Sequence, residues 1–142
     1  MEVKEIMSSP VEAISPDAMI TEAADKMKEF DIGVLPVMKQ DKIAGMITDR
    51  DIVVRIIAER LNPQNTPVSR VMTSDVVCCY EDTGMEEAAR MMEEKKVHRL
   101  VVLGHNQTVA GILSVGDIAR KMKDEHILYE ILERVCEPAR TY

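Results

Sequence analysis

The sequence predicts a mixed α/β (α+β) fold made of two similar units and a helical tail. The first observation behind this prediction is an internal repeat, in which residues 3–7 (VKEIM) return as residues 68–72 (VSRVM) at a spacing of 65 residues. The second is that residues 45–52 (GMITDRDI) return as residues 111–118 (GILSVGDI) at a spacing of 66 residues. A repeated unit of this size indicates a pseudo-symmetric pair.

We predict the same order of elements in each copy: a short helix at the start, a brief extended segment, an amphipathic helix, two strands and a second helix. Apolar residues at i, i+3, i+4 and i+7 predict the amphipathic helices, one stripe running from Ile20 to Met27 and the other from Met85 to Met92. Residues 34–38 with 43–48, and 99–103 with 109–114, have β-branched residues around polar turns, which indicates two hairpins.

We predict a first repeat at residues 1–62, a linker at 63–67, a second repeat at 68–122 and a helical tail at 123–142. Pro63 and Pro67 mark the linker because proline stops a helix. The tail has one apolar face that needs a partner, formed by Ile127, Leu128, Ile131, Leu132 and Val135. Its own chain or a second subunit could cover this face, and we expect the subunit contact.

Composition excludes several function classes. The net charge of −7 argues against a nucleic-acid partner, since affinity for a phosphate backbone comes from clustered Lys and Arg. The absence of a run of 18 apolar residues argues against a membrane span, so we expect a soluble, cytoplasmic protein. The three cysteines, with Cys78 and Cys79 adjacent, match neither a metal-ligand spacing nor an even set of disulfides, and we expect reduced, buried thiols.

Both copies place a hydroxyl at the end of a predicted strand and a carboxylate three residues later. These pairs are Thr48 with Asp51 and Ser114 with Asp117. The first turn of a helix has unsatisfied backbone N–H groups that suit a phosphate, and a carboxylate one turn on can accept hydrogen bonds from both hydroxyls of a ribose. The pattern therefore describes a nucleotide-shaped site.

The same pattern also predicts a capping box, in which the hydroxyl and the carboxylate each bond to the other residue's backbone N–H. Two features favour the binding interpretation. Asp recurs where Glu would reach back better, and Gly45 and Gly111 can keep a strand surface clear for a flat ligand. From the pattern in one copy alone, both interpretations stay open.

The motif Gly-x-[Ile/Leu]-[Thr/Ser]-x-x-Asp-Ile, placed after a hydrophobic hairpin and repeated, resembles the cystathionine-β-synthase (CBS) domain family. Residues 34–37 (VLPV) and 96–102 (KVHRLVV) resemble that family's segment before its second strand. The resemblance covers residues 1 to about 122 and is to a tandem pair, or Bateman module. It implies two β-α-β-β-α units packed through their sheets, with two related clefts between them.

The resemblance also implies a regulatory binding module rather than an enzyme, with no required cofactor. Its ligand would be an adenosine-containing molecule such as AMP, ADP, ATP or S-adenosylmethionine. Asp51 and Asp117 would hold riboses, and Thr48 and Ser114 would support ribose or phosphate. Arg50 would face a phosphate from the first helix.

Each cleft is expected to borrow residues from the opposite copy. The cleft of Ser114 and Asp117 would draw on Ser8, Ala13 and Gly33, and the cleft of Thr48 and Asp51 on Thr73, Cys78 and His98. Because Arg50 corresponds to Gly116, and Gly33 to His98, the two clefts should differ in phosphate affinity.

A basic patch formed by Lys95, Lys96, His98 and Arg99 stands out in this acidic chain. Its positive field would attract phosphates, although cations also favour the end of a helix. For the two lysines both interpretations stay open, and for His98 and Arg99 we favour the ligand role.

Two other functions are alternatives to the binding module. An enzyme is disfavoured because His98, His105 and His126 have no evident nucleophile partner and no metal-ligand spacing. A structural dimerisation unit without ligand would use Asp51 and Asp117 only as caps. For the binding module we expect a homodimer and a regulated protein partner that the sequence does not identify.

Overall fold

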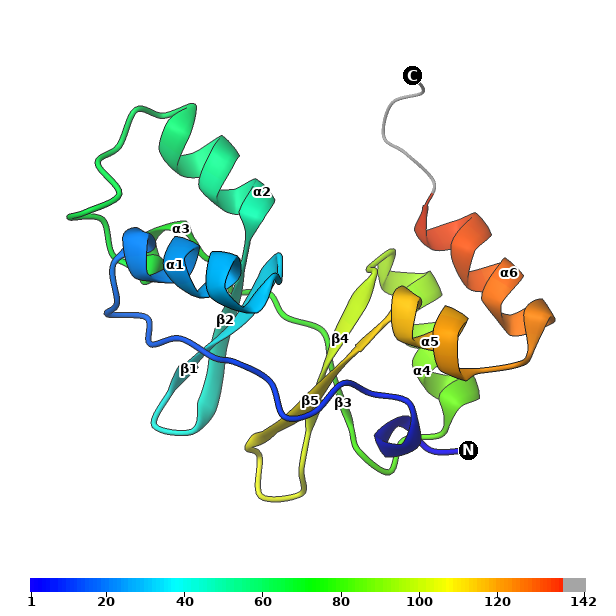
Figure 1. The fold of residues 1–142 in the computed structure, drawn as a ribbon. Coiled ribbons are helices and arrows are strands. Elements are labelled where there is room, and N and C mark those ends of the chain that lie inside the picture. The colour runs from blue at the N-terminus through cyan, green and yellow to red at the C-terminus, as the bar shows by residue number, and fades with distance from the viewer. Residues whose placement is uncertain (137–142) are drawn as a thin grey trace. The chain divides into compact units, whose positions relative to one another are not determined.

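The computed structural model describes residues 1–136, which form two compact units. One unit is Glu12–Val76, and the other joins Met1–Val11 to the described residues from Val77 onward. The units therefore do not coincide with the sequence repeats. We call residues 1–11 of the first repeat and residues 68–76 of the second repeat the leading segments. Each leading segment belongs to the unit that holds the other repeat's hairpin (Figure 1).

The Glu12–Val76 unit is built on an antiparallel hairpin of β1 (Val34–Lys39) and β2 (Lys42–Thr48). Backbone bridges widen the hairpin on both sides, where Ile14 pairs with Val37 and Thr73 pairs with Met46. The helical elements of the unit are α1 (Ile20–Phe30), α2 (Asp49–Ile52), the π-helical turn η2 (Val53–Ile57) and α3 (Val68–Val71). The helices and the hairpin share one core, which includes Ile20, Leu35, Ile47, Ile56 and Val68.

The second unit has the same arrangement, but its sheet has three strands instead of two. Strand β3 (Cys78–Tyr80) runs parallel to β4 (Arg99–Leu103), which pairs antiparallel with β5 (Val109–Ser114). Ser8 pairs antiparallel with Ile112. The helical elements are the 3₁₀ turn η1 (Val3–Glu5), α4 (Met85–Lys95), α5 (Val115–Lys121) and α6 (Glu125–Val135). The predicted α/β (α+β) class, with two similar halves and an extra C-terminal helix, is confirmed.

Both amphipathic helices end at a residue in the left-handed conformation. Asp31 after α1 has a φ of 53°, and Lys96 after α4 has a φ of 52°. The N–H of Asp31 donates to the carbonyl of Met27, and the N–H of Lys96 donates to the last turn of α4 in the same way. This helix end satisfies otherwise unpaired carbonyls and redirects the chain into β1 or β4.

Glycine is required where a leading segment pairs with the hairpin. A Cβ added to Gly45 would lie 2.7 Å from the carbonyl oxygen of Thr73, and one added to Gly111 would lie 2.7 Å from that of Ser8. The prediction that these glycines keep a strand surface clear for a ligand is therefore wrong. They make room for the backbone of the leading segment, an approach that any Cβ would obstruct.

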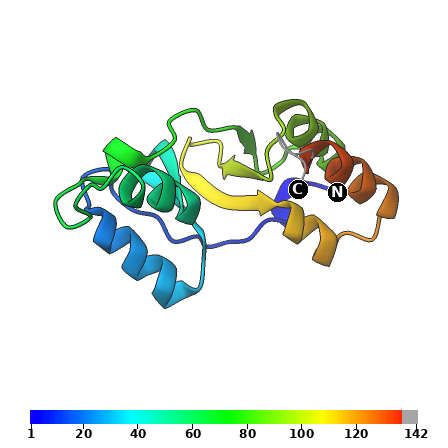
Figure 2. The same ribbon diagram turned by 90° about the horizontal axis from the view of Figure 1, so that it is seen from above.

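Helix α6 confirms the helix predicted in the tail, while residues 137–142 of that tail lie outside the described residues. Ile131 and Val135 are buried in one core with Met92 of α4 and Ile118 of α5. Figures 1 and 2 show α6 beside α4. The expectation of a contact with a second subunit is therefore wrong for Ile131 and Val135, which their own unit covers. It stays a prediction for Leu132, which is 39% exposed.

The expectation of buried thiols holds for Cys79 and is wrong for Cys136, which is exposed, while Cys78 is half-buried. Burial raises the pKa of the Cys78 thiol. Burial, with smaller effects from Cys78 and Glu87, raises the pKa of Cys79 to about 12. Within residues 1–136 no helix is both long and apolar enough to cross a membrane.

We predict that Gly45→Ala and Gly111→Ala each lower the free energy of unfolding by about 1–3 kcal/mol, because the new Cβ forces the paired segments apart. Gly84→Ala is the matched control, since an added Cβ at Gly84 has nothing within 4 Å. Its effect should stay below about 1 kcal/mol. Urea denaturation measures all three variants, and equal stabilities would contradict the close approach.

We predict that iodoacetamide near pH 8 modifies Cys136 first, Cys78 more slowly and Cys79 only after unfolding. The thiolate is the reactive species, and burial keeps Cys79 protonated and covered. Peptide mass spectrometry of the folded chain resolves the three sites over time. Rapid labelling of Cys79 in the folded chain would show that its strand opens.

Candidate functional site

Both hydroxyl–carboxylate pairs form capping boxes. Thr48 Oγ1 accepts the Asp51 N–H at 3.1 Å, and Asp51 Oδ2 accepts the Thr48 N–H at 3.0 Å. Ser114 and Asp117 make the same two bonds at 3.0 Å each. The strand ends in extended backbone at the hydroxyl residue and the helix begins at the next one, so two unpaired N–H groups are satisfied. In each aspartate, therefore, only Oδ2 takes part in the cap.

The second carboxylate oxygen differs between the repeats. Asp117 Oδ1 accepts from Ser8 Oγ at 2.9 Å and from Arg120 Nη2 at 3.0 Å, and Asp117 is only 1% exposed. Asp51 Oδ1 lies 3.8 Å from Arg55 Nη1, beyond hydrogen-bond distance, and its side chain is 14% exposed. Asp117 thus has its hydrogen bonds made within the protein, whereas Asp51 keeps room for an incoming donor.

A cation four residues after each aspartate holds the leading segment in place. Arg55 Nη1 donates to the carbonyl of Val71 at 2.8 Å, and Lys121 Nζ donates to the carbonyl of Ile6 at 3.0 Å. Val71 and Ile6 are repeat-equivalent positions. The sequence prediction missed these two cations, although their equal spacing from Asp51 and Asp117 was a usable signal.

Gly33 and His98 flank the strand ends of their own repeats. The carbonyl of Gly33 accepts the Asp49 N–H at 3.0 Å, and the carbonyl of His98 accepts the Val115 N–H at 3.0 Å. A Cβ on Gly33 would lie 2.7 Å from Asp49 Oδ2. The sequence prediction also missed Asp49, which places a carboxylate beside Thr48 where the second repeat has an apolar residue.

A cavity of about 310 Å³ lies at the strand end of the second repeat. Its lining residues are His98, Arg99, Ser114, Val115, Gly116 and Cys136. It therefore brings together four predicted site residues from the start of β4 and the junction of β5 with α5. One of them, His98, was predicted for the cleft of Thr48 and Asp51, and the cavity instead places it beside Ser114. Cys136, which directly follows α6, was not predicted to belong to it. His98 Nε2 also contacts the carbonyl oxygen of Val135 at 3.1 Å.

The other predicted site residues are distributed between the two units. Ser8 lies against Asp117, and Thr73 pairs with β2, the strand that ends at Thr48. Cys78 begins β3 opposite Val101, in the unit that holds Ser114. Ala13, Gly33 and Arg50 belong to the Glu12–Val76 unit, together with Thr48 and Asp51. Their roles as ligand contacts stay predictions.

The basic patch is divided by the structure. Lys95 lies in the last turn of α4 and Lys96 is the residue that ends the helix, where cations favour the helix dipole. This supports the helix-end interpretation of the two lysines. His98 and Arg99 line the cavity instead.

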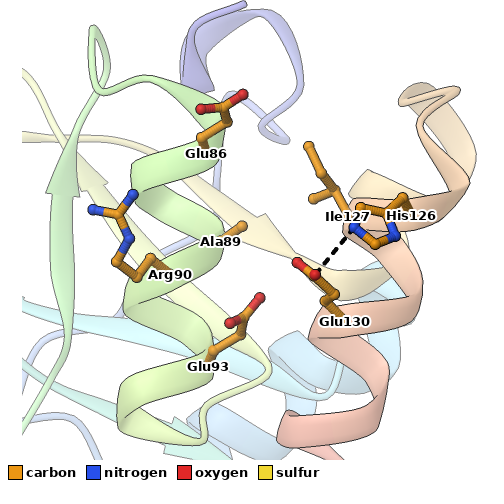
Figure 3. Close-up of a pocket in the computed structure, with 7 residues that line it drawn as sticks. All are labelled: Glu86, Ala89, Arg90, Glu93, His126, Ile127 and Glu130. Carbon is orange, nitrogen blue, oxygen red and sulfur yellow. Dashed lines mark ion pairs between the residues drawn. The ribbon is translucent and has the colours of Figure 1, made fainter.

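A second cavity, of about 280 Å³, lies between α4 and α6 (Figure 3). Glu86 and Glu93 of α4 and Glu130 of α6 line it, and His126 Nε2 lies 3.1 Å from Glu130 Oε1. Arg90 lines it as well, but the three carboxylates outnumber this one cation and disfavour a phosphate ligand. Among residues 1–136, no three His, Cys, Asp or Glu side chains are grouped to hold a metal ion.

Known proteins are similar in sequence to most of this chain. The chain is 38% identical over 117 residues to the CBS domain-containing protein YhcV of Bacillus subtilis, covering 82% of each chain. It is 32% identical over 136 residues to hypoxic response protein 1 of Mycobacterium tuberculosis, covering 95% of this chain and 94% of that protein.

A solved structure of the CBS domain pair of protein MJ0100 matches with a TM-score of 0.74 and 27% identity, over 84% of this chain and 94% of that chain. That protein was crystallised in complex with 5′-methylthioadenosine and S-adenosyl-L-methionine. The family described as CBS domain matches residues 3–58 and again residues 68–124. The chain therefore belongs to the CBS domain family, of which it carries two tandem copies.

Proposed function

We propose that this chain is a regulatory module that binds an adenosine-containing nucleotide, rather than an enzyme. The observation that carries the proposal is the cavity that Ser114, His98 and Arg99 line together. A hydroxyl and two potential cations at one strand end suit a ribose phosphate better than an apolar ligand. The equivalent position at Thr48 would form the second site.

In the second repeat the ribose would bind to Asp117. Its Oδ1 already holds two donors, the Ser8 hydroxyl and the Arg120 guanidinium. The two hydroxyls of a ribose also donate hydrogen bonds, although without the charge of the guanidinium, and could replace these donors, while Oδ2 keeps its bond to the Ser114 N–H. Capping and ligand binding would then use different oxygens of one carboxylate.

The two repeats would differ in the charge that they offer to a phosphate. Arg50 is exposed in the first repeat, but Asp49 precedes it and adds a negative charge. The second repeat has Gly116 and Val115 at these positions and takes its cation from Arg99 instead. We expect phosphorylated ligands to bind the two sites with different affinities.

The size of the ligand sets the expected affinity. An AMP-sized ligand of roughly 23 non-hydrogen atoms, at about 0.3 kcal/mol per atom, gives about 7 kcal/mol of binding free energy and a Kd on the order of 10 μM. Such a site would respond to changes in metabolite concentration. The complex of the MJ0100 domain pair with two adenosine-containing ligands supports this class of ligand.

A ligand-free dimerisation module is the second candidate. Two observations favour it: both aspartates are engaged in capping boxes, and Val53, Val54 and Ile57 are exposed on one helical segment. An exposed apolar patch of this kind suits a contact with another subunit, so we propose a homodimer for either function. The three cysteines form no disulfide within residues 1–136, which fits the cytoplasm that we expect for both.

We predict that AMP, ATP, 5′-methylthioadenosine or S-adenosylmethionine binds the full chain in titration calorimetry. Asp117→Asn and Asp51→Asn should each weaken binding at their own repeat about tenfold or more, since hydrogen bonds to a charged group are worth about 1.5–3 kcal/mol. An Asn oxygen can still accept the capping N–H, so the stability of both variants should change by about 1 kcal/mol or less.

Asp124→Asn is the matched control. Asp124 caps α6 by accepting the N–H groups of His126 and Ile127, and it lines neither hydroxyl–carboxylate site. The affinity of the Asp124→Asn variant for nucleotide should equal that of the unmodified chain. If none of the four ligands binds at millimolar concentration, the ligand-free module is the correct function.

A further inference from the structure

We propose that the end of helix α6 gates the cavity of the second repeat, so that docking of this end and binding of a nucleotide phosphate compete. This inference rests on the proposed function and adds a means of regulating it. Helix α6 follows the second match to the CBS family, which ends at residue 124. No part of α6 belongs to either repeat, yet its end forms one side of the cavity.

Two contacts place the end of α6 at the cavity. Cys136, the residue that ends the helix, is part of the lining. The carbonyl of Val135 lies 3.1 Å from His98 Nε2, and because a carbonyl only accepts, the ring nitrogen is the donor. The last carbonyls of a helix have no partner within it, so His98 supplies one of the missing bonds.

The Nε2–H of His98 cannot donate to the Val135 carbonyl and to a bound phosphate at the same time. A phosphate placed beside Arg99 and Ser114 would be a stronger acceptor than the neutral carbonyl, since bonds to ionised acceptors are about twice as strong. We infer that a bound phosphate takes this donor and leaves the Val135 carbonyl without it. Occupancy of the cavity then weakens the attachment of the helix end.

The size of the cavity points to the same movement. At about 310 Å³ it is at the lower end of the range of roughly 300–1,000 Å³ that ligand pockets occupy. Arg99 and Ser114 lie opposite each other in the ladder of β4 and β5, and Val115 is bonded to the carbonyl of His98. The end of α6 is the side of the cavity that is not tied into this sheet, so a larger ligand is accommodated by moving it.

The amide of Cys136 reports the position of the helix end, because its N–H donates to the carbonyl of Leu132. We expect saturating ATP to raise the hydrogen-exchange rate of this amide about threefold or more in the full chain, because release of the helix end opens this bond. The amide of Val101, which donates to the carbonyl of Val77, is the internal reference, and its exchange rate should not change. A rate that falls or does not change would show that Cys136 is only a static wall, and would overturn the gate.

Val135→Ala tests the competition in the opposite direction. It removes buried methyl groups that hold the helix end but keeps the carbonyl, so the affinity of the second repeat for ATP should rise about fivefold. Val102→Ala is the matched control, with the same truncation at a buried position of β4 in the same unit. An unchanged or reduced affinity in Val135→Ala, or an equal rise in Val102→Ala, contradicts the gate.

The failure of the gate is distinguishable from the failure of the proposed function. If calorimetry detects no nucleotide binding, the function and the gate fall together. If binding occurs and Asp117→Asn does not weaken it, the second repeat is not occupied and the gate alone is overturned. If Asp117→Asn weakens binding and ATP still leaves the Cys136 rate unchanged, the nucleotide site stands and the gate is again rejected.

Discussion

The backbone pairing between each leading segment and a hairpin strand is the constraint on which both candidate sites depend. Ser8 and Ile112 exchange two backbone hydrogen bonds, as do Thr73 and Met46. These bonds are possible only because the strand residue next to each pair is glycine. The pairing delivers a hydroxyl to the edge of the strand whose end carries the capping box, and the cation one turn into the helix secures the segment from the other side.

A capping box and a ribose site make compatible demands on one carboxylate. The bond from the backbone N–H to one oxygen holds the side chain in a single orientation before any ligand arrives, which reduces the ordering cost of binding. The capping bond therefore also fixes the position of the second carboxylate oxygen, which can then accept a hydrogen bond from another group. In the second repeat that partner is Ser8, a residue far away in the sequence, so the site and the segment pairing are linked.

The sequence alone predicted the elements that have a regular period. The stripes from Ile20 to Met27 and from Met85 to Met92 became α1 and α4, because one helix face must be buried. The purpose of Gly45 and Gly111 was not predictable, since the segment that approaches them lies far away in the chain. The partner of α6 was missed for a related reason: an amphipathic pattern indicates that a face is covered, but not by which element.

The two repeats have the same arrangement of elements, and they differ mainly in the residues at their strand ends. The first repeat has Asp49 and Arg50 beside its hydroxyl, whereas the second has an uncharged pair and borrows from elements outside the motif. One of these elements is the end of α6, which has no counterpart in the first repeat. If, as we propose, the carbonyl at the end of α6 and a bound phosphate compete for the same donor on His98, the addition of one helix is sufficient to make the two repeats respond differently to one ligand.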